Sequence, residues 1–550
     1  MLRATNAALL FFLCATLAAC SRGGEGEELP IRKTAPVILP DGSSLLRRGN
    51  GAEPESLDPH KAQSTTSSNI LRDLYEGLVS EAPDGALIPG VAERWDISDD
   101  GFTYTFYLRE TAKWSNGEPV TAGDFVYSLR RSVDPATGSS YSAILSPILN
   151  AGDIIAGKLP PDALGVEALD ARALRIRLKA STPYFIGLLA HASSHPVYRP
   201  AVEAHGDRFT QPGRAVSNGA YQIREWVALS HIVAERNPHY WDNTNTKIDA
   251  VKFQVIDNAE AEFKRYLAGE LDLTESVPIP RLDWAKRRLP AEYKSYPSIS
   301  TYYYGLNLER EPFKNRSALR RALSMALDRK ILVEKVTRGG EIPAYGWVPP
   351  GILNYTQQKP EWADWPREKQ VAEAQRLYRE AGYSDKKPLS VELRYNTSEG
   401  HKKVAAAAAA MWKYTLGVKV TLVNEEWKVL LQNVNAKKVT QIYRAGWVGD
   451  YNDAYTFAEL MHSRFGLNGT GYASVQYDAL VDAASIEADL GKRRALLEEA
   501  ERVLLADQPL IPVYFYVSKR MVKPYVRGYQ GNIMNHHASK DLWIEAGARP

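Results

Sequence analysis

Residues 103–132 read TYTFYLRETAKWSNGEPVTAGDFVYSLRRS. In the first seven residues apolar and polar side chains alternate, which is typical of a β-strand with one buried face. Further along, Phe125, Val126 and Leu129 fall on one side of a helix between Ala122 and Ser132, so this part predicts an amphipathic helix. A strand followed by a helix indicates a mixed α/β fold.

The rest of the chain repeats this alternation. Further strands are expected at 174–179, 251–256, 389–395, 419–423 and 512–517. Helices are expected over the apolar stripe 318–327, between Pro366 and Gly382, and over the alanine run 405–410, although such a run can also be low-complexity sequence. A chain of 550 residues exceeds one usual hydrophobic core, so it should form at least two domains.

The N-terminus has the features of a bacterial lipoprotein signal. Residues 7–19 are almost wholly apolar and end in Leu-Ala-Ala directly before Cys20. The run is too short to span a bilayer permanently, and small residues before the cysteine favour cleavage there with acylation of the thiol. An ordinary secretory signal with an incidental cysteine is the alternative. We therefore expect a signal peptide over 1–19, lipid on Cys20, and a flexible tether over 20–44.

Composition excludes several classes of function. The only cysteines are Cys14 and Cys20, and cleavage would remove the first, so disulfides, thiolate metal sites and cysteine catalysis drop out. Lys and Arg number 68 against 65 Asp and Glu, and they are dispersed along the chain, so we expect no nucleic-acid partner. The 30 tyrosines and 12 tryptophans favour a binding cleft, but large extracytoplasmic enzymes share that bias.

Catalytic and metal-binding motifs are poor. No Gly-x-Ser-x-Gly elbow, His-Glu-x-x-His zinc helix or glycine-rich phosphate loop occurs in the sequence. The histidine pairs His191/His195 and His536/His537 lack a convincing third ligand. Pro196 favours a turn over the helix that would let histidines four residues apart share a metal. The sequence therefore predicts no metal, no cofactor and no enzymatic activity.

Residues 443–453 read YRAGWVGDYND and combine basic, aromatic and acidic side chains. Asp450 can pair with a cationic amino group and Arg444 with an anionic carboxylate, while Trp447 can line an apolar slot. The stretch thus holds complements for both ends of a zwitterionic oligomer. Taken alone, the same composition also describes an ordinary surface loop.

An ordered series of motifs extends over most of the chain. It consists of ESLDPHK at 55–61, DLYEGL at 73–78, AKWSNG at 112–117, PVTA at 119–122, DFVYS at 124–128, NGAY at 218–221, TYYY at 301–304, PAYG at 343–346 and YNTS at 395–398. From about residue 45 to 524 the chain resembles the bacterial periplasmic oligopeptide-binding proteins, which are solute receptors of peptide ABC importers, and their murein-peptide-binding relatives. So long a series in one order is highly specific.

The resemblance implies an α/β, two-lobed, three-domain periplasmic-binding-protein fold that closes at a hinge over an enclosed ligand cleft. The expected domains are a discontinuous core of lobe I (45–76, 201–302 and 518–550), an accessory domain of lobe I (77–200) and lobe II (303–517). The implied protein is a monomer, and its implied partners are peptides of roughly two to five residues or murein peptides, together with an ABC permease and its ATPase subunits.

The resemblance also carries pocket residues over one by one. Asp450 matches the carboxylate that takes the ligand's α-ammonium group, and Arg444 and His401 match the residues that receive the C-terminal carboxylate of shorter and longer peptides. The other implied wall residues are Tyr141 beside the peptide backbone, the aromatic residues Trp427 and Trp447, and Tyr304, Leu431, Val448 and Gly449. Residues 63–65 are implied to offer main-chain groups to the ligand as an added strand.

Two positions depart from the family's pattern. Gln63 stands where the family commonly has glutamate, and Thr65 replaces an apolar residue. A less negative pocket suggests a preference for more acidic peptides or cell-wall fragments. We expect a lipid-anchored receptor of the cell envelope, on the inner or the outer membrane, that delivers peptides to a permease. Murein tripeptide binding for cell-wall recycling and an extracytoplasmic peptide hydrolase are the alternatives.

Overall fold

A computed structural model describes residues 44–545 of the protein. The expected signal peptide, Cys20 and all but the last residue of the expected tether lie outside the described residues, as do residues 546–550. Within 44–545, none of the helices combines the length and the apolar character needed to cross a bilayer.

The described strands form three sheets of four or six strands and two short pairs. The first sheet has the order β1 (Leu45–Gly49), β10 (Ala250–Gln254), β9 (His231–Arg236), β8 (Tyr221–Val227); the second β4 (Ala92–Ile97), β5 (Thr103–Leu108), β7 (Ala173–Arg177), β6 (Val166–Ala168). The six-stranded sheet has the order β12 (Ile342–Pro343), β16 (Leu510–Met521), β11 (Tyr293–Leu306), β15 (Ile442–Val448), β13 (Ser390–Asn396), β14 (Lys419–Glu425). The pairs are β2 (Val79–Glu81) with β3 (Leu87–Pro89), and β17 (Val526–Arg527) with β18 (Trp543–Ile544).

The α-helices lie between and around these sheets. Their bounds are α1 Thr65–Leu74, α2 Ala122–Val133, α3 Ala151–Ile155, α4 Phe185–Leu188, α5 Arg199–His205, α6 Ala259–Leu267, α7 Leu282–Arg288, α8 Ser317–Ala326, α9 Arg329–Ile331, α10 Arg367–Glu380, α11 Glu399–Leu416, α12 Trp427–Ala436, α13 Tyr455–Leu460, α14 Val475–Ile486 and α15 Leu490–Asp507. The expected α/β class is confirmed.

The expected elements occur close to where the sequence predicts them. The alternating stretch at residue 103 is β5, and the amphipathic stretch after it is α2, which begins with a capping box between Thr121 and Asp124. The alanine run is part of α11, with Ala405 and Ala408 on its buried face. Pro366 is the residue before α10 and not part of its first turn, so that detail of the prediction is wrong.

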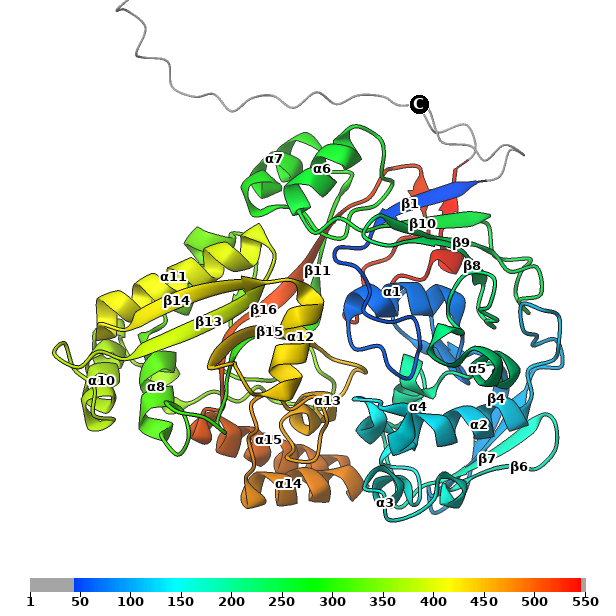
Figure 1. The fold of residues 1–550 in the computed structure, drawn as a ribbon, viewed down its shortest axis with the longest axis horizontal. Helices are drawn as coiled ribbons and strands as arrows, with labels where there is room; N and C mark the ends of the chain where they lie inside the picture. The colour runs from blue at the N-terminus through cyan, green and yellow to red at the C-terminus, as the bar shows by residue number, and fades with distance from the viewer. Residues whose placement is uncertain (1–43, 546–550) are drawn as a thin grey trace, which may run out of the picture.

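Two long strands join the lobes. Figure 1 shows β11 and β16 running from the lobe that contains β1 and β8–β10 into the lobe that contains β13–β15. Their pairing shifts register between Pro297 and Thr301, which is the kind of irregularity that bends a strand. The lobe boundaries expected after residues 302 and 517 fall on these two strands. A hinge at this place would require only a few backbone segments to bend.

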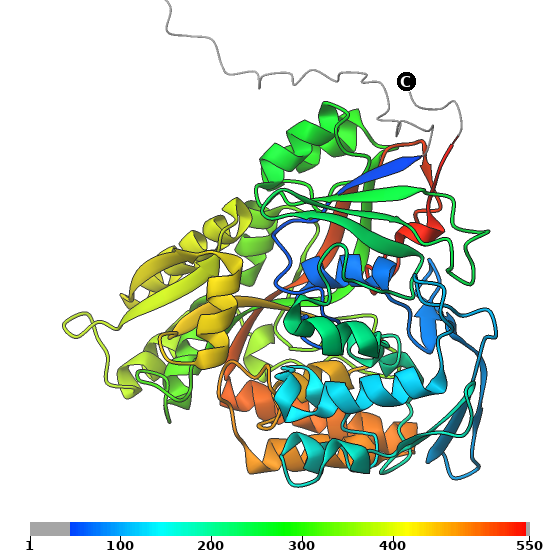
Figure 2. The same cartoon turned by 45° about the vertical axis from the view of Figure 1, so that its right-hand side comes forward.

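The lobes are closed on one another. Tyr184, just before α4, stacks on Tyr451 at 5.3 Å and on Tyr455 at 4.8 Å between ring centroids, and both partners belong to the other lobe. Buried side chains from 78–189 and from 430–504 form one continuous apolar cluster. Figure 1 and Figure 2 both show α3 close to the end of α14. Closure therefore buries a surface between segments that are remote in sequence.

Candidate functional site

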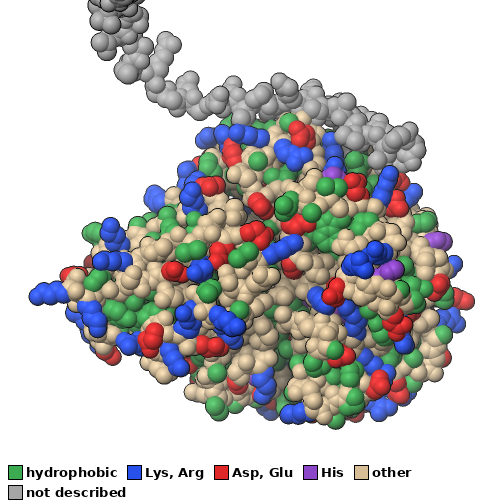
Figure 3. Space-filling view, in the orientation of Figure 1, with side chains coloured by type: hydrophobic (Ala, Val, Ile, Leu, Met, Phe, Trp, Pro, Cys, Tyr) green, Lys and Arg blue, Asp and Glu red, His purple; other side chains and the backbone are tan. Residues whose placement is uncertain are grey.

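A cavity of about 520 Å³ lies between the lobes. One wall comes from α1 and residues 190–195, and the opposite wall comes from β15, α12 and the start of α11. The volume is within the range of pockets that enclose small ligands. Charges on the outer surface, by contrast, are mixed in sign over the face that Figure 3 shows.

Asp450 lies directly after β15 and is buried in this cavity. Its Oδ2 accepts a hydrogen bond from Thr456 Oγ1 at 3.1 Å, and its Oδ1 accepts one from the Tyr141 hydroxyl at 3.5 Å. Burial raises the pKa of Asp450 to about 7, although the hydrogen bonds from Thr456 and Tyr141 favour the ionised form. The carboxyl group is therefore only partly ionised at neutral pH in the empty cavity.

His191 does not supply the missing positive charge. Its Nε2 lies 3.5 Å from Asp450 Oδ1, but burial lowers the pKa of His191 to about 3, so the ring is neutral. Among residues 44–545, no lysine or arginine forms an ion pair with Asp450. The carboxyl group thus has room for a cationic partner from outside the protein.

Arg444 is the complementary group on β15. Its Nη2 donates to the Tyr516 hydroxyl at 2.6 Å and its Nη1 to Asn396 Oδ1 at 3.1 Å, while the guanidinium lies 4.9 Å from the centre of the Tyr302 ring. Burial disfavours the charged form, but the neighbouring tyrosines outweigh it and raise the pKa of Arg444. Within the described chain, no carboxylate pairs with this guanidinium.

The cavity therefore holds a buried carboxyl group and a half-buried guanidinium, which are separate and have no counter-ion among the described residues. An unpaired buried charge is costly, and a partner that enters the cavity relieves that cost. Because Asp450 and Arg444 carry opposite charges, a ligand with a cationic and an anionic end would relieve both at once.

Aromatic rings line the space between these groups. Trp447 lies parallel to Tyr141 at 6.2 Å, and its indole N–H donates to the backbone oxygen of Thr456 at 3.0 Å. Trp427 also lines the cavity, and its buried indole N–H has no acceptor among the described residues. His401 faces Tyr302 at 5.7 Å, and burial lowers its pKa well below the usual value.

Most of the residues expected at the site lie on the cavity wall. They are Gln63, Thr65, Tyr141, His401, Trp427, Leu431, Arg444, Trp447, Val448, Gly449 and Asp450. Tyr304 does not, and its prediction is wrong. Neighbouring side chains on a strand point to opposite faces, so Tyr303 lines the cavity while Tyr304 is buried against Trp412, with 5.8 Å between ring centroids.

Two of the main-chain amides in residues 63–65 are engaged within the protein. Thr65 begins α1, and the backbone N–H groups of Gln63 and Ser64 both donate to Glu55 Oε1, at 2.5 and 2.9 Å. These amides are therefore not free to pair with a ligand strand. The side chain of Gln63 instead bridges the lobes.

The Gln63 side chain forms two hydrogen bonds, of which the one with Asn435 crosses between the lobes. Gln63 Nε2 donates to Ser140 Oγ at 3.2 Å, and Gln63 Oε1 accepts from Asn435 Nδ2 at 3.3 Å. Gln63 therefore contributes to closure as well as to the cavity wall.

Several wall residues were missed in the sequence or considered for another role. His191 and His536 were considered only as metal ligands, whereas both line the cavity, and Arg72, Tyr516 and Met534 were not considered. They come from segments far apart in the chain, and no local pattern marks them. In the part of the chain that the structure describes, no group of three or more His, Cys, Asp or Glu side chains could hold a metal ion.

Comparison with known proteins gives the family. The model of the bacterial extracellular solute-binding proteins, family 5, matches residues 86–468. This chain belongs to that family. It is 44% identical to the periplasmic oligopeptide-binding protein of Escherichia coli over 500 residues, which cover 90% of this chain and 91% of that protein. It is 40% identical to the periplasmic murein peptide-binding protein of Escherichia coli over 498 residues, which cover 90% and 92%.

Solved structures agree with the fold and with closure. Haemophilus influenzae OppA in complex with RPPGFSPFR has a TM-score of 0.89 at 39% identity, covering 91% of this chain and 99% of that one. The Escherichia coli murein tripeptide binding protein has a TM-score of 0.89 at 40% identity, covering 92% and 99%. Its unliganded open form has a TM-score of only 0.65 at 39% identity, covering 93% and 99%. The lobes of this family 5 protein therefore adopt the closed arrangement.

The raised pKa of Asp450 predicts a pH-dependent cost to folding. An aspartate with a pKa of about 7 when folded and about 3.9 when unfolded stabilises the fold at low pH, and that contribution is lost as the pH rises through 7. Asp450→Asn should therefore stabilise the unliganded protein more at pH 8 than at pH 5, by a difference of about 2–3 kcal/mol. Urea unfolding at both pH values measures it. If Asp450→Asn changed the stability equally at the two pH values, the raised pKa of Asp450 would be contradicted. Asp99→Asn, at an exposed position, is the control.

Proposed function

We propose that this family 5 protein is an extracytoplasmic receptor that binds short peptides in an extended conformation and delivers them to an ABC-type oligopeptide permease. The observation that supports this most strongly is the enclosed cavity in which Asp450 and Arg444 lack protein counter-ions. The names of the Escherichia coli relatives, which bind oligopeptides and murein peptide, point the same way.

The proposed binding begins at the amino end of the peptide. The ammonium group enters beside Asp450, where the Tyr141 hydroxyl and the neutral His191 ring complete its surroundings. Its positive charge favours the ionised carboxylate, so Asp450 gives up its proton as the peptide binds. A charge-assisted hydrogen bond in an enclosed site is stronger than the same pair at a surface.

The carboxylate end is received at the other end of β15. Arg444 keeps donors for it, because its hydrogen bonds to Asn396 and Tyr516 use only two of the five N–H groups of the guanidinium. For longer peptides, His401 at the start of α11 can donate one N–H as a neutral ring. Both charged ends occur in every free peptide, so these contacts give affinity without reading the peptide's sequence.

Side chains of the peptide would occupy the space between the end groups. Trp447, Trp427 and Leu431 offer aromatic and apolar surface there. Water in the remaining volume can adapt to side chains of different kinds. The proposed receptor is therefore broad in selectivity and holds the peptide without cleaving it.

We also propose that the mature protein is anchored in the cell envelope through lipid on Cys20. The support is the apolar run before Cys20 and the periplasmic location in the names of the relatives. Expression with labelled palmitate should label the wild-type protein, while Cys20→Ala should give an unlabelled and uncleaved precursor. Labelling that survives Cys20→Ala, or a wild-type protein without label, would contradict the anchor.

The peptide-binding proposal is tested by removing either member of the ammonium–carboxylate pair. Trialanine should bind Asp450→Asn about 30- to several thousand-fold more weakly than wild type, since losing one partner of a buried charged pair costs roughly 2–5 kcal/mol. Wild type should bind N-acetyl-trialanine with a similar loss of affinity relative to trialanine. Asp450→Asn should lower the affinity for N-acetyl-trialanine little further. Isothermal titration calorimetry at pH 7.5 measures all four affinities. Equal affinity of wild type for the free and acetylated peptides would refute the proposal.

A further inference from the structure

The cavity wall carries one more positive than negative side chain. Its Lys and Arg residues are Arg72, Arg444, Lys519 and Arg520, and its Asp and Glu residues are Glu275, Glu341 and Asp450. Four histidines also line the wall, namely His191, His195, His401 and His536, and burial lowers the pKa of each. Because these histidines are neutral at pH 7, they do not change the count of charged side chains on the wall.

Two ion pairs account for most of these charges. Arg520 pairs with Glu275 at 2.9 Å, and Lys519 pairs with Glu341. The charges left over are those of Asp450, Arg444 and Arg72. A zwitterionic peptide would neutralise the first two, so the guanidinium of Arg72 would still lack a counter-ion inside the cavity.

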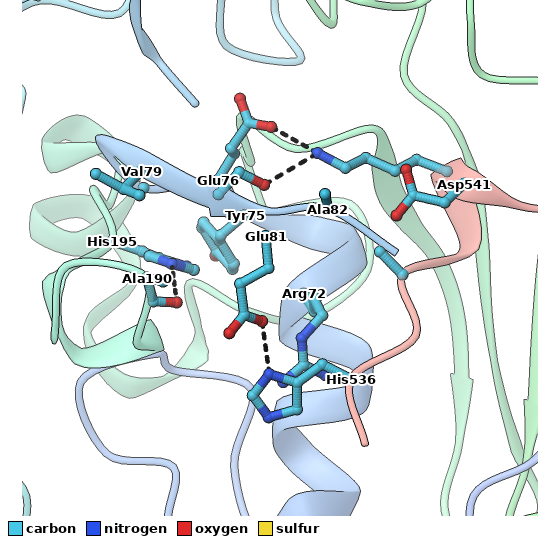
Figure 4. Close-up of a pocket in the computed structure, with 14 residues that line it drawn as sticks. Arg72, Tyr75, Glu76, Val79, Glu81, Ala82, Ala190, His195, His536 and Asp541 are labelled. Atoms are coloured by element: carbon cyan, nitrogen blue, oxygen red, sulfur yellow. Dashed lines mark hydrogen bonds and ion pairs between the residues drawn. The ribbon is translucent and has the colours of Figure 1, made fainter. Parts of the chain in front are cut away.

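Arg72 projects from α1 with few partners of its own. Its Nη1 donates to the backbone oxygen of Ser68 at 3.4 Å, and no described residue forms an ion pair with it. It lines the main cavity and also a small pocket behind the wall, where Figure 4 shows it next to His536. A guanidinium has five N–H donors, so most of the hydrogen-bonding capacity of Arg72 is open.

The anions near Arg72 form hydrogen bonds with groups other than Arg72. Burial lowers the pKa of Arg72, and the charges of Glu81 and Asp73 offset only part of that effect. Glu81 Oε2 accepts from His536 Nδ1 at 2.6 Å, and Asp73 Oδ1 accepts from the backbone N–H of Ser539 at 2.7 Å. Both lie behind the cavity wall and neither pairs directly with Arg72.

We propose that Arg72 forms a third charged subsite of the cleft, which takes a second carboxylate of the ligand. This inference rests on the proposed peptide-binding function and names the preferred class, peptides with an acidic side chain. Ala190 and His195 line both the main cavity and the pocket behind it, and His191 between them lies 3.5 Å from Asp450. Arg72 therefore lies toward the amino end of the ligand, and the acidic side chain belongs to one of its first two residues.

The test compares peptides that differ only by a charge. Wild type should bind Ala-Glu-Ala or Glu-Ala-Ala about 10- to 100-fold more tightly than the matching peptide with glutamine, as measured by isothermal titration calorimetry at pH 7.5. Arg72→Gln should remove that preference, because it should lower the affinity for the acidic peptide only. Arg72→Lys should retain part of the preference. Unchanged binding of the glutamine peptide also shows that the variant is folded.

A matched control separates a subsite from the overall charge. Lys61 pairs with Asp207 at 2.7 Å outside the cavity wall, so Lys61→Gln changes net charge equally and should leave the preference intact. If wild type bound both peptides of each pair with equal affinity, the third subsite alone would be overturned. The same would follow if Arg72→Gln lowered the affinity for both peptides equally. Failure of every peptide to bind wild type would overturn the proposed function as well.

Discussion

The buried carboxyl group of Asp450 is the constraint on which the rest of the site depends. Thr456 from its own lobe and Tyr141 from the other lobe both donate to it, so its surroundings are complete only when the lobes are closed. Tyr184 inserts between Tyr451 and Tyr455 only a few residues further along the chain. A ligand that binds this carboxylate therefore also favours closure, because it interacts better with the closed state than with the open one.

This arrangement places function and stability in opposition. Burial also raises the pKa of Glu459 well above its usual value, and the nearby Asp450 adds to that effect. Two acids close together in an enclosed site resist ionisation, and a cationic ligand relieves the resistance at Asp450. The empty closed protein is thus held by aromatic contacts between the lobes, while the carboxyl group of Asp450 has no cationic partner among the described residues.

The sequence predicts local structure well and also locates two charged residues of the cavity wall. The alternating pattern locates β5 and the apolar stripe locates α2, because each depends only on spacing along the chain. Asp450 and Arg444 could be found together because a single strand and the residues after it supply both. The resemblance to a family extended this to Tyr141 and Trp427, which lie in other segments of the chain.

What the sequence did not predict depends on contacts between remote segments. Tyr304 and Tyr303 are adjacent tyrosines, and only packing against Trp412 decides which of them faces the cavity. Arg72 and His536 are far apart in the chain and meet only because the C-terminal segment packs beside α1. Charge balance inside a cavity is a property of the assembled wall, so no single motif contains it.

The proton on Asp450 tests the central claim most directly. Calorimetric titration of trialanine at pH 6.5 in two buffers that differ in ionisation enthalpy gives the number of protons exchanged on binding. With a pKa of about 7 in the empty cavity, Asp450 should release roughly three-quarters of a proton, and Asp450→Asn should release almost none. Proton release of the same size from Asp450→Asn, or none from wild type, would contradict the account.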